Sequence, residues 1–294
     1  ALRDSGAFQL SKLLADAWCA AFVWKKTDEF PYAITTGVLR ELESNLGSIP
    51  SWLQTEIARL AEQYSFFHWH LAFPEIFGTN GGLQRENSEV DFHSPITLRN
   101  PPSSGFDCIL GNPPWEKVQL EEKQFFEIRC PDIARAKSSE RWKLIRQLSV
   151  IDPSLWKEWT RTLESREGEV HFLKHSGRFQ FGAKGNLNTY ALFLEVSIQF
   201  LSQNGFCGII IPSGIATDDS KKHFFQYLVD SRLLRCLYDF ENKGIFFPEV
   251  HSSYKFCLLT AGKVMHLAVE NPEFVFFSHD VNDLHELNRR FILS

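Results

Sequence analysis

The sequence of 294 residues has no long hydrophobic run, no closely paired cysteines and no excess of positive charge. No apolar run approaches the roughly 20 residues that cross a bilayer, and residues 1–10 lack the charged start and apolar stretch of a signal peptide, so we expect no membrane partner. The six cysteines form no CxxC pair, which excludes a disulfide framework or a structural zinc site and predicts buried free thiols in a reducing compartment. The net charge of −5 excludes a polycation, so any contact with nucleic acid must be a local patch.

Aromatic residues are what the sequence has in abundance, with 27 phenylalanines and eight tryptophans against one methionine. Aromatic rings serve protein cores, interfaces and base-stacking platforms alike, so composition alone does not assign them. The length and the apolar content of 44% are enough for one large core or two modest ones, which excludes a disordered chain.

The hydrophobic pattern predicts a helical beginning followed by alternating strands and helices. The first part has helical spacing, then an aromatic segment that Pro74 stops, then a Gly-, Asn-, Ser- and Pro-rich loop or boundary. A strand ending in two prolines, a charged helical segment and a second series of helices and strands follow. Alternating strands and helices indicate an α/β fold with a parallel or mixed sheet. The expected helices are 7–26, 39–64, 116–169, 188–202 and 219–229, the strands 106–110, 206–211, 232–240, 253–260 and 273–277, the loop 78–104 and a turn 203–205.

The motif Asn-Pro-Pro-Trp at Asn112–Trp115 follows the first predicted strand directly. Ligands of open α/β sheets bind at the carboxyl ends of strands. The prolines stiffen the turn and remove two backbone donors, which leaves carbonyl acceptors beside the Asn112 side-chain oxygen. A planar amine with two N–H donors would find two acceptors there, and Trp115 would offer a flat surface for stacking, a contact of about 1–3 kcal/mol per base.

At these residues the sequence resembles the gamma-type amino-methyltransferases that form N6-methyladenine in DNA, whose motif is Asn-Pro-Pro-(Tyr/Phe/Trp). More closely, it is similar to the Eco57I-like and type IIG restriction-modification methylases and their relatives in phage defence. The similarity extends over residues 66–77, 105–117, 188–215 and 238–260, and so covers about residues 66–262.

The resemblance implies a Rossmann-like class I methyltransferase catalytic half with a mixed sheet, a mainly helical N-terminal region and a helical insertion. We therefore expect a helical region with its lead-in loop over residues 1–104, and a catalytic half over residues 105–294 with the insertion at about 116–170. It also implies S-adenosylmethionine as cofactor, double-stranded DNA as partner, other subunits of a restriction or defence complex, and a bacterial or archaeal cytoplasm.

The resemblance also implies roles for single residues. Asn112 and the Pro113 carbonyl would accept hydrogen bonds from the target adenine amine, with Pro114 packed near the cofactor. Trp115 would stack on the flipped base, and Phe247, or Phe246 in an alternative register, would form the second wall. The residues that correspond to the cofactor-adenine motif are Phe193 and, less closely, Asn188 and Tyr190.

The family's glycine-rich cofactor turn is missing from residues 1–111, and no target-recognition domain is evident. We therefore expect a middle slice of a longer enzyme with an incomplete cofactor site. Two alternatives remain open: a non-catalytic DNA-binding or scaffold subunit with the same fold, and a methyltransferase that acts on ribosomal RNA or on a glutamine amide.

Three weaker signals have simpler explanations. The histidine pairs His68/His70 and His171/His175 are typical of structural or exposed histidines. Glu241 and Lys243 form half of a nuclease signature, with Asp230 or Asp239 upstream, within a stretch that the methylase resemblance already explains. The basic stretch 129–146 is typical of a solvated helix face, and it also supplies our candidates for DNA-phosphate contacts, Arg135, Lys137, Arg141 and Lys143.

Overall fold

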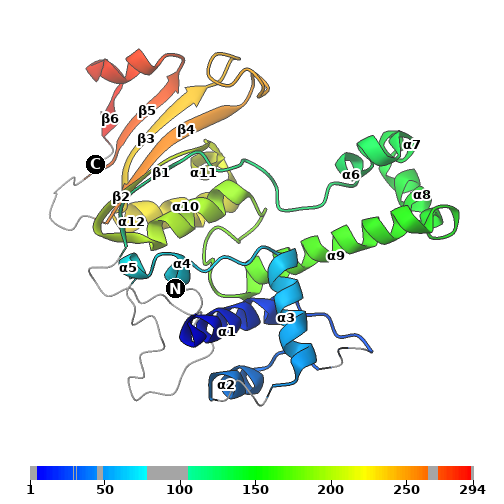
Figure 1. Cartoon of the computed structure of the whole chain (residues 1–294). Coiled ribbons are helices and arrows are strands. Elements are labelled where there is room, and N and C mark those ends of the chain that lie inside the picture. Colours follow the sequence, from blue (N-terminus) through cyan, green and yellow to red (C-terminus); the bar gives the residue numbers. More distant parts are fainter. Residues whose placement is uncertain are drawn as a thin grey trace. The chain divides into compact units, whose positions relative to one another are not determined.

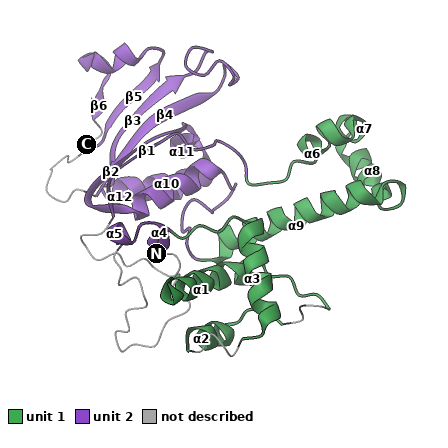
Figure 2. Ribbon diagram, in the orientation of Figure 1, with its two compact units in different colours: residues 1–68, 118–176 green, residues 69–117, 177–294 purple. Residues whose placement is uncertain are grey.

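The computed structural model describes residues 5–28, 30, 32–44, 49–77, 105–263 and 271–292. The chain forms two compact units, each built from two separate stretches of sequence (Figure 2). One unit consists of residues 1–68 and 118–176, the other of residues 69–117 and 177–294. The expected loop 78–104 lies outside the described residues, so the expected boundary after residue 104 stays a prediction.

The first unit begins with three helices, α1 (Gly6–Val23), α2 (Thr36–Ser44) and α3 (Ser51–Gln63) (Figure 1). The predicted helix over residues 7–26 is confirmed. The predicted helical stretch 39–64 is two helices, because Pro50 has no backbone N–H to continue a helix and stands as the N-cap of α3.

The helical insertion belongs to the same unit, as α6 (Glu122–Arg129), α7 (Pro131–Arg135), α8 (Ser138–Ile151) and α9 (Pro153–His175). Its core includes Phe126, which packs on Trp159 with ring centroids 5.1 Å apart. The Asp152 carboxylate accepts a hydrogen bond from the Leu155 N–H and so caps α9. The predicted helical segment after the Asn-Pro-Pro-Trp motif is therefore confirmed.

The second unit starts with the short helices α4 (Trp69–Ala72) and α5 (Pro74–Phe77). Pro74, predicted to stop the aromatic segment, is also the first residue of α5. The aromatic rings of this segment pack edge to face against Phe106, as the Phe77–Phe106 centroid distance of 5.5 Å shows. The aromatic segment that precedes β1 in the sequence therefore packs against that strand at Phe106.

The sheet of the second unit has six strands in the order β1-β2-β4-β3-β5-β6. β1 pairs parallel with β2, β4 lies antiparallel between β2 and β3, β5 is parallel to β3 and β6 antiparallel to β5. The strands are β1 (Phe106–Gly111), β2 (Leu201–Pro212), β3 (Leu234–Glu241), β4 (Lys255–Gly262), β5 (Glu273–Ser278) and β6 (Phe291–Ile292).

Helices α10 (Thr189–Gln199), α11 (Gly214–Thr217) and α12 (Lys222–Asp230) complete this unit together with short 3-10 turns. α10 and α12 lie across the sheet (Figure 1) and share one core with it, which includes Leu194, Ile211 and Leu228. The mixed sheet with its helices confirms the expected α/β architecture, which is that of a Rossmann-like methyltransferase fold.

Two local expectations are wrong. A turn was expected at residues 203–205, but β2 runs through them from Leu201, because Gly205 packs against the Phe106 carbonyl and the strand pairs irregularly with β1 there. Cys19, Cys207 and Cys257 are buried thiols as predicted, whereas Cys108 is exposed, since β1 pairs only with β2 among the described strands. Within the described ranges, no helix combines the length and the apolar content needed to cross a bilayer.

Candidate active site

The Asn-Pro-Pro-Trp motif leaves the carboxyl end of β1, where Gly111 is the last strand residue. The Asn112 side chain is exposed, and no hydrogen bond joins it or the Pro113 carbonyl to another part of the chain that the structure describes. Both groups are acceptors at the carboxyl edge of the sheet, which is where α/β folds bind ligands. The geometry therefore leaves them available to an incoming pair of N–H donors.

Trp115 is held in place by the neighbouring strand. Its Nε1 donates a hydrogen bond of 3.2 Å to the Ile210 carbonyl of β2. Its ring lies nearly parallel to that of Phe256, at the start of β4, with centroids 6.1 Å apart and an angle of 26°. A tryptophan that is bonded at one end and packed along one face keeps a fixed orientation.

Thr189, which the motif search did not single out, ties the end of the motif to α10. Its hydroxyl donates to the Pro114 carbonyl at 2.5 Å, and its backbone N–H donates to the Glu116 carbonyl at 2.9 Å. The Glu116 N–H returns a bond of 3.1 Å to the Thr189 Oγ1. Threonine at the start of a predicted helix was the available sequence signal, but its partners lie 73 and 75 residues away and only the fold brings them together.

Phe247 comes to the same place from the loop between β3 and β4. Its ring stands edge to face with Trp115, at a centroid distance of 5.5 Å and an angle of 77°. Phe246, the alternative register, packs instead on Phe240 and Phe256. The structure thus brings Phe247 to Trp115 and places Phe246 in the packing beneath.

The three residues matched to the cofactor motif have different surroundings. Phe193 is 50% exposed on α10. Tyr190 is 4% exposed within the core of the unit, and burial raises the pKa of its phenol to about 12. Asn188 is the N-cap residue of α10 and pairs with Lys117 in an isolated β-bridge. Only the Phe193 ring is presented to a ligand in this arrangement.

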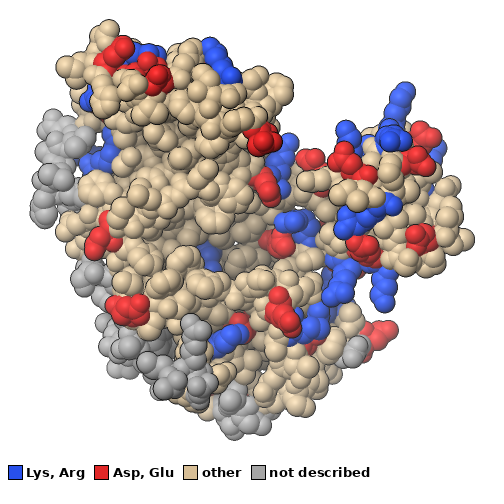
Figure 3. Space-filling view, turned by 45° about the horizontal axis from the view of Figure 1, so that its top comes forward, with Lys and Arg blue, Asp and Glu red and all other residues tan. Residues whose placement is uncertain are grey.

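The four candidate phosphate contacts lie in the other unit, on the helical insertion. Arg135, Lys137 and Lys143 are exposed, whereas the half-buried Arg141 guanidinium donates to three backbone carbonyls. Arg141 therefore closes the α7–α8 turn. Basic and acidic side chains are intermixed over this insertion, at the right of Figure 3. In the sequence, Glu127, Asp132 and Glu140 lie close to the basic residues.

The Glu241 and Asp239 carboxylates of the partial nuclease signature are held in structural interactions. The Glu241 carboxylate pairs with Lys243 at 3.0 Å, Lys255 at 2.9 Å and His279 at 2.8 Å. These hydrogen bonds, with that of His279 the strongest, lower the pKa of Glu241 to about 2. Asp239 is buried and accepts hydrogen bonds from the Ser213 hydroxyl and the Phe277 N–H. Glu241 is thus the centre of an ion-pair network.

The histidine pairs also have structural partners. His68 Nε2 lies 2.7 Å from the Asp16 carboxylate, and His171 Nδ1 lies 2.8 Å from the Phe22 carbonyl. No group of three potential metal ligands occurs among the residues whose placement is described.

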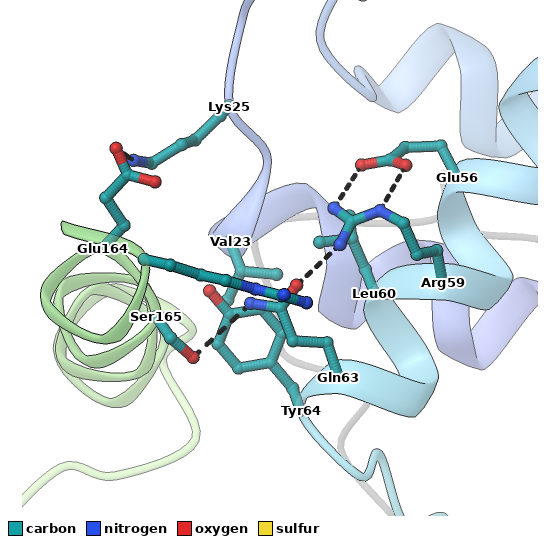
Figure 4. A pocket seen from close by; sticks show the side chains of 10 residues that line it. Val23, Lys25, Glu56, Arg59, Leu60, Gln63, Tyr64, Glu164 and Ser165 are labelled. Atoms are coloured by element: carbon teal, nitrogen blue, oxygen red, sulfur yellow. Dashed lines mark hydrogen bonds and ion pairs between the residues drawn. The ribbon is translucent and has the colours of Figure 1, made fainter. Parts of the chain in front are cut away.

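One pocket of about 220 Å³ lies within the helical unit, between α1, α3 and α9 (Figure 4). Its charges are largely paired, since Arg59 binds the Glu56 carboxylate through two nitrogens and Lys25 pairs with Glu164 at 2.8 Å. None of the residues predicted for the site line it. This pocket therefore has no link to the motif chemistry.

Comparison with known proteins finds a resemblance over part of the chain. Residues 161–246 match the family model described as Eco57I restriction-modification methylase. Over this range the chain is similar to the Eco57I-like methylases. It is also 48% identical over 59 residues to the Type II methyltransferase M.AccI of Acinetobacter calcoaceticus, a match that covers 19% of this chain and 11% of that protein.

The matched range contains α10, β2 and β3, together with Thr189 and Phe193. The Asn112–Trp115 turn lies before the matched range and Phe247 directly after it. The chain spans about a tenth of the length of the curated relative it matches.

Proposed function

We propose that this chain supplies the target-base pocket of a DNA adenine-N6 methyltransferase that uses S-adenosylmethionine. The observation that carries the proposal is the convergence of the Trp115 and Phe247 rings beside the free acceptors of Asn112 and Pro113. The family match supports a place in a restriction-modification system, and the name of the matched relative supports methyl transfer.

The acceptors address the weak nucleophilicity of an adenine amine. The lone pair of an exocyclic amine is delocalised into the ring, and hydrogen bonds from both N–H groups to fixed acceptors favour its localisation on nitrogen. The Asn112 side-chain oxygen and the Pro113 carbonyl are two such acceptors on a turn that two prolines stiffen. The chain thus orients the amine and raises its electron density, and no general base is required before transfer.

The aromatic pair receives the base once it leaves the duplex. Extrusion costs a few kcal/mol of unstacking, and an aromatic contact of about 1–3 kcal/mol offsets much of this. A base between two parallel rings needs about 7 Å, or two layers at van der Waals separation, and the Trp115–Phe247 centroids are 5.5 Å apart. A base therefore stacks on one ring only after the Phe247 ring has rotated out of the way. Phe247 is the ring that moves, because Trp115 is hydrogen-bonded to the Ile210 carbonyl.

Part of the cofactor site fits as well. The exposed Phe193 ring is available for stacking on an adenine, and it stands on the helix that Thr189 joins to the Asn-Pro-Pro-Trp turn. Tyr190 is committed to the core, so we assign it no contact. S-adenosylmethionine supplies the electrophilic methyl group when bound. Because residues 1–111 contain no glycine-rich turn, we assign this chain only the Phe193 side of the site.

The decisive experiment replaces Asn112 by alanine in the full-length protein. We expect Asn112→Ala to abolish transfer of labelled methyl groups to DNA while DNA affinity changes by less than about threefold, because the amide acts on the reacting amine. Asn204→Ala is the matched control, since Asn204 is exposed on β2 and forms no part of the site.

Unchanged methyl incorporation by Asn112→Ala would contradict the proposal. In the same labelling assay, the wild-type protein is tested in parallel reactions with DNA, with ribosomal RNA and with protein acceptors. Labelling of RNA or protein but not DNA would replace the DNA assignment by one of the alternative acceptors. The absence of labelling in every acceptor, with DNA binding intact, would favour a non-catalytic subunit.

A further inference from the structure

The loop between β3 and β4, residues 242–254, carries Phe247 and is closed by one buried side chain. Asn242 is 1% exposed, the first residue after β3. The turn that follows has left-handed backbone at Lys243 and Gly244, with φ of 42° and 75°. The loop therefore reverses sharply at its start, and Asn242 lies inside the reversal.

Every polar group of Asn242 is bonded within this loop. Its Nδ2 donates to the carbonyls of Phe247 and Val250, both at 2.9 Å, and its Oδ1 accepts from the Phe247 N–H at 2.9 Å. Its backbone N–H donates to the Tyr254 carbonyl at 3.0 Å, and its carbonyl accepts from the Ile245 N–H at 2.8 Å. The Asn242 side chain therefore bonds both backbone groups of Phe247, whose carbonyl also accepts from the Val250 N–H at 3.0 Å.

We propose that Asn242 is a positioning residue that sets the place of the Phe247 ring in the base pocket. The inference rests on the proposed function, because it makes the placement of that ring matter for methyl transfer. Phe247 has no backbone ladder partner in a strand. Besides a turn hydrogen bond from the Val250 N–H to its carbonyl, the Asn242 amide holds both of its backbone groups and so fixes where its Cα lies. From there the ring reaches both Trp115 and Phe256.

The chemistry of the site requires an asparagine. Two partly buried carbonyls accept from the side chain and one partly buried N–H donates to it, all within reach of an amide that a single methylene group joins to the backbone. Aspartate has the same shape and keeps the acceptor, but it turns a carboxylate oxygen toward the carbonyls of Phe247 and Val250. Asn242→Asp therefore tests the hydrogen bonds with little change in volume.

The ion pairs of Glu241 do not replace this role. They link Glu241, at the end of β3, to Lys243, Lys255 and His279, and so connect the two ends of the loop. Successive residues of a strand point to opposite faces, and Glu241 is paired in register with Lys255 while Phe240 is paired with Phe256. The ion pairs thus lie on the other face of the sheet from the aromatic cluster of Trp115, Phe247 and Phe256.

The first experiment measures the loop itself. Hydrogen exchange of the full-length protein is compared between wild type, Asn242→Asp and Asn242→Ala, with Asn282→Asp as the matched control on an exposed asparagine. We expect at least tenfold faster exchange for the Phe247 amide in both Asn242 variants, with the amides of β3 and β4 unchanged. Unchanged protection of the Phe247 amide overturns the proposal, whatever the substrate of the protein is.

The second experiment measures methyl transfer in a double-mutant cycle with Phe247→Ala. We expect Asn242→Asp to lower kcat by about 10- to 100-fold, as a misplacement of about 1 Å does, with the KM for S-adenosylmethionine within about twofold of wild type. Because both changes act through one ring, the double variant should be no slower than Phe247→Ala alone. Additive losses would mean that Asn242 acts elsewhere and would overturn the proposal.

A fluorescent adenine analogue at the target position separates positioning from general stability. We expect Asn242→Asp to change the fluorescence of the flipped analogue as Phe247→Ala does, measured below the melting transition of each variant, while the Asn282→Asp control keeps the wild-type signal. A fluorescence change in the control as well would assign the effect to the whole fold and overturn the proposal. If wild type transfers no methyl to DNA while the Phe247 amide responds to Asn242, the proposed function fails and the positioning of the ring stands.

Discussion

At the scale of single residues, the candidate site depends on a few hydrogen bonds that join distant parts of the chain. The Thr189 hydroxyl holds the Pro114 carbonyl, and this leaves the Pro113 carbonyl as the free acceptor of the turn. Trp115 is fixed from the other side by Ile210. The turn is therefore stiffened by its own prolines and anchored by neighbours on α10 and β2.

The role of the Thr189 hydroxyl is tested by Thr189→Val, which keeps the shape and removes the hydrogen bonds. We expect a loss of about 0.5–1.5 kcal/mol in the free energy of unfolding, because the turn loses the hydrogen bonds of the Thr189 hydroxyl. Methyl transfer should slow as the turn loosens. Urea unfolding and a methyl-transfer assay measure the two effects. Thr189→Ser retains the hydroxyl and should behave like wild type, and equal stability of the valine and serine variants would refute this role.

At the scale of elements, the segment between α9 and α10 is held by two buried charges. The Glu195 carboxylate accepts from the N–H groups of Gln180, Phe181 and Gly182. The Lys221 ammonium donates to the carbonyls of Gly182, Lys184 and Asn186. The segment has no regular ladder of its own, so these side chains supply the partners that its backbone requires. It leads directly into Asn188 and Thr189.

Lys221 gives this element a dependence on pH. Burial removes solvation from the Lys221 ammonium and so lowers its pKa below the usual 10.5. As the pH rises, the folded chain therefore loses this proton at a lower pH than the unfolded chain does. The contribution of Lys221 to stability therefore increases as pH rises from its lowered pKa toward 10.5. Urea unfolding between pH 7 and 10.5 measures the free energy of unfolding of wild type and of Lys221→Met. Wild type should be more stable by roughly 3 kcal/mol at pH 7, and this difference should widen as the pH rises.

Lys222→Met is the matched control for this measurement, because Lys222 is an exposed neighbour whose ion pair with Asp219 is a surface one. A surface pair contributes about 0–1 kcal/mol, so this variant should stay close to wild type at every pH. A gap between wild type and Lys221→Met that narrows with rising pH would contradict the assignment of a lowered pKa.

At the scale of the whole molecule, the chain interleaves two units, and the residues proposed to meet DNA are divided between them. The proposed base pocket belongs to the sheet unit, while Arg135, Lys137 and Lys143 belong to the helical unit. Arg141 is excluded from a clean test, because its guanidinium holds three carbonyls of the insertion and a charge reversal there would unfold it.

The contribution of the insertion to DNA binding is predicted from counterion release. Reversing Arg135, Lys137 and Lys143 to glutamate should lower DNA affinity and reduce the slope of log K against log salt by about 2–3, since each phosphate contact contributes about 0.9. A titration at several salt concentrations measures this slope. The same triple reversal at Lys26, Lys157 and Lys174, which are exposed in the same unit, is the control. Equal slopes for both variants would return the basic stretch to a solvated helix face.

Much of the fold could be predicted from the sequence, because local patterns report it. Helical spacing over residues 7–26 and a strand stopped by two prolines are local features, and both are confirmed. The strand through residues 203–205 could not be predicted, since Gln-Asn-Gly is typical of a turn and only the packing of Gly205 against Phe106 keeps it extended. The exposure of Cys108 depends on which strand edges are paired, and hydrophobicity does not report that.

The candidate site divides in the same way. By itself, the sequence determined the Asn-Pro-Pro-Trp turn and its place after a strand, because proline restricts the backbone wherever it occurs. Only the tertiary structure decided that Phe247 faces Trp115, that Tyr190 is committed to the core, and that Thr189 and Asn242 bond the backbone of Pro114 and Phe247. The reason is physical: these assignments depend on hydrogen bonds and packing between residues far apart in the chain, and such contacts exist only once the sheet has formed.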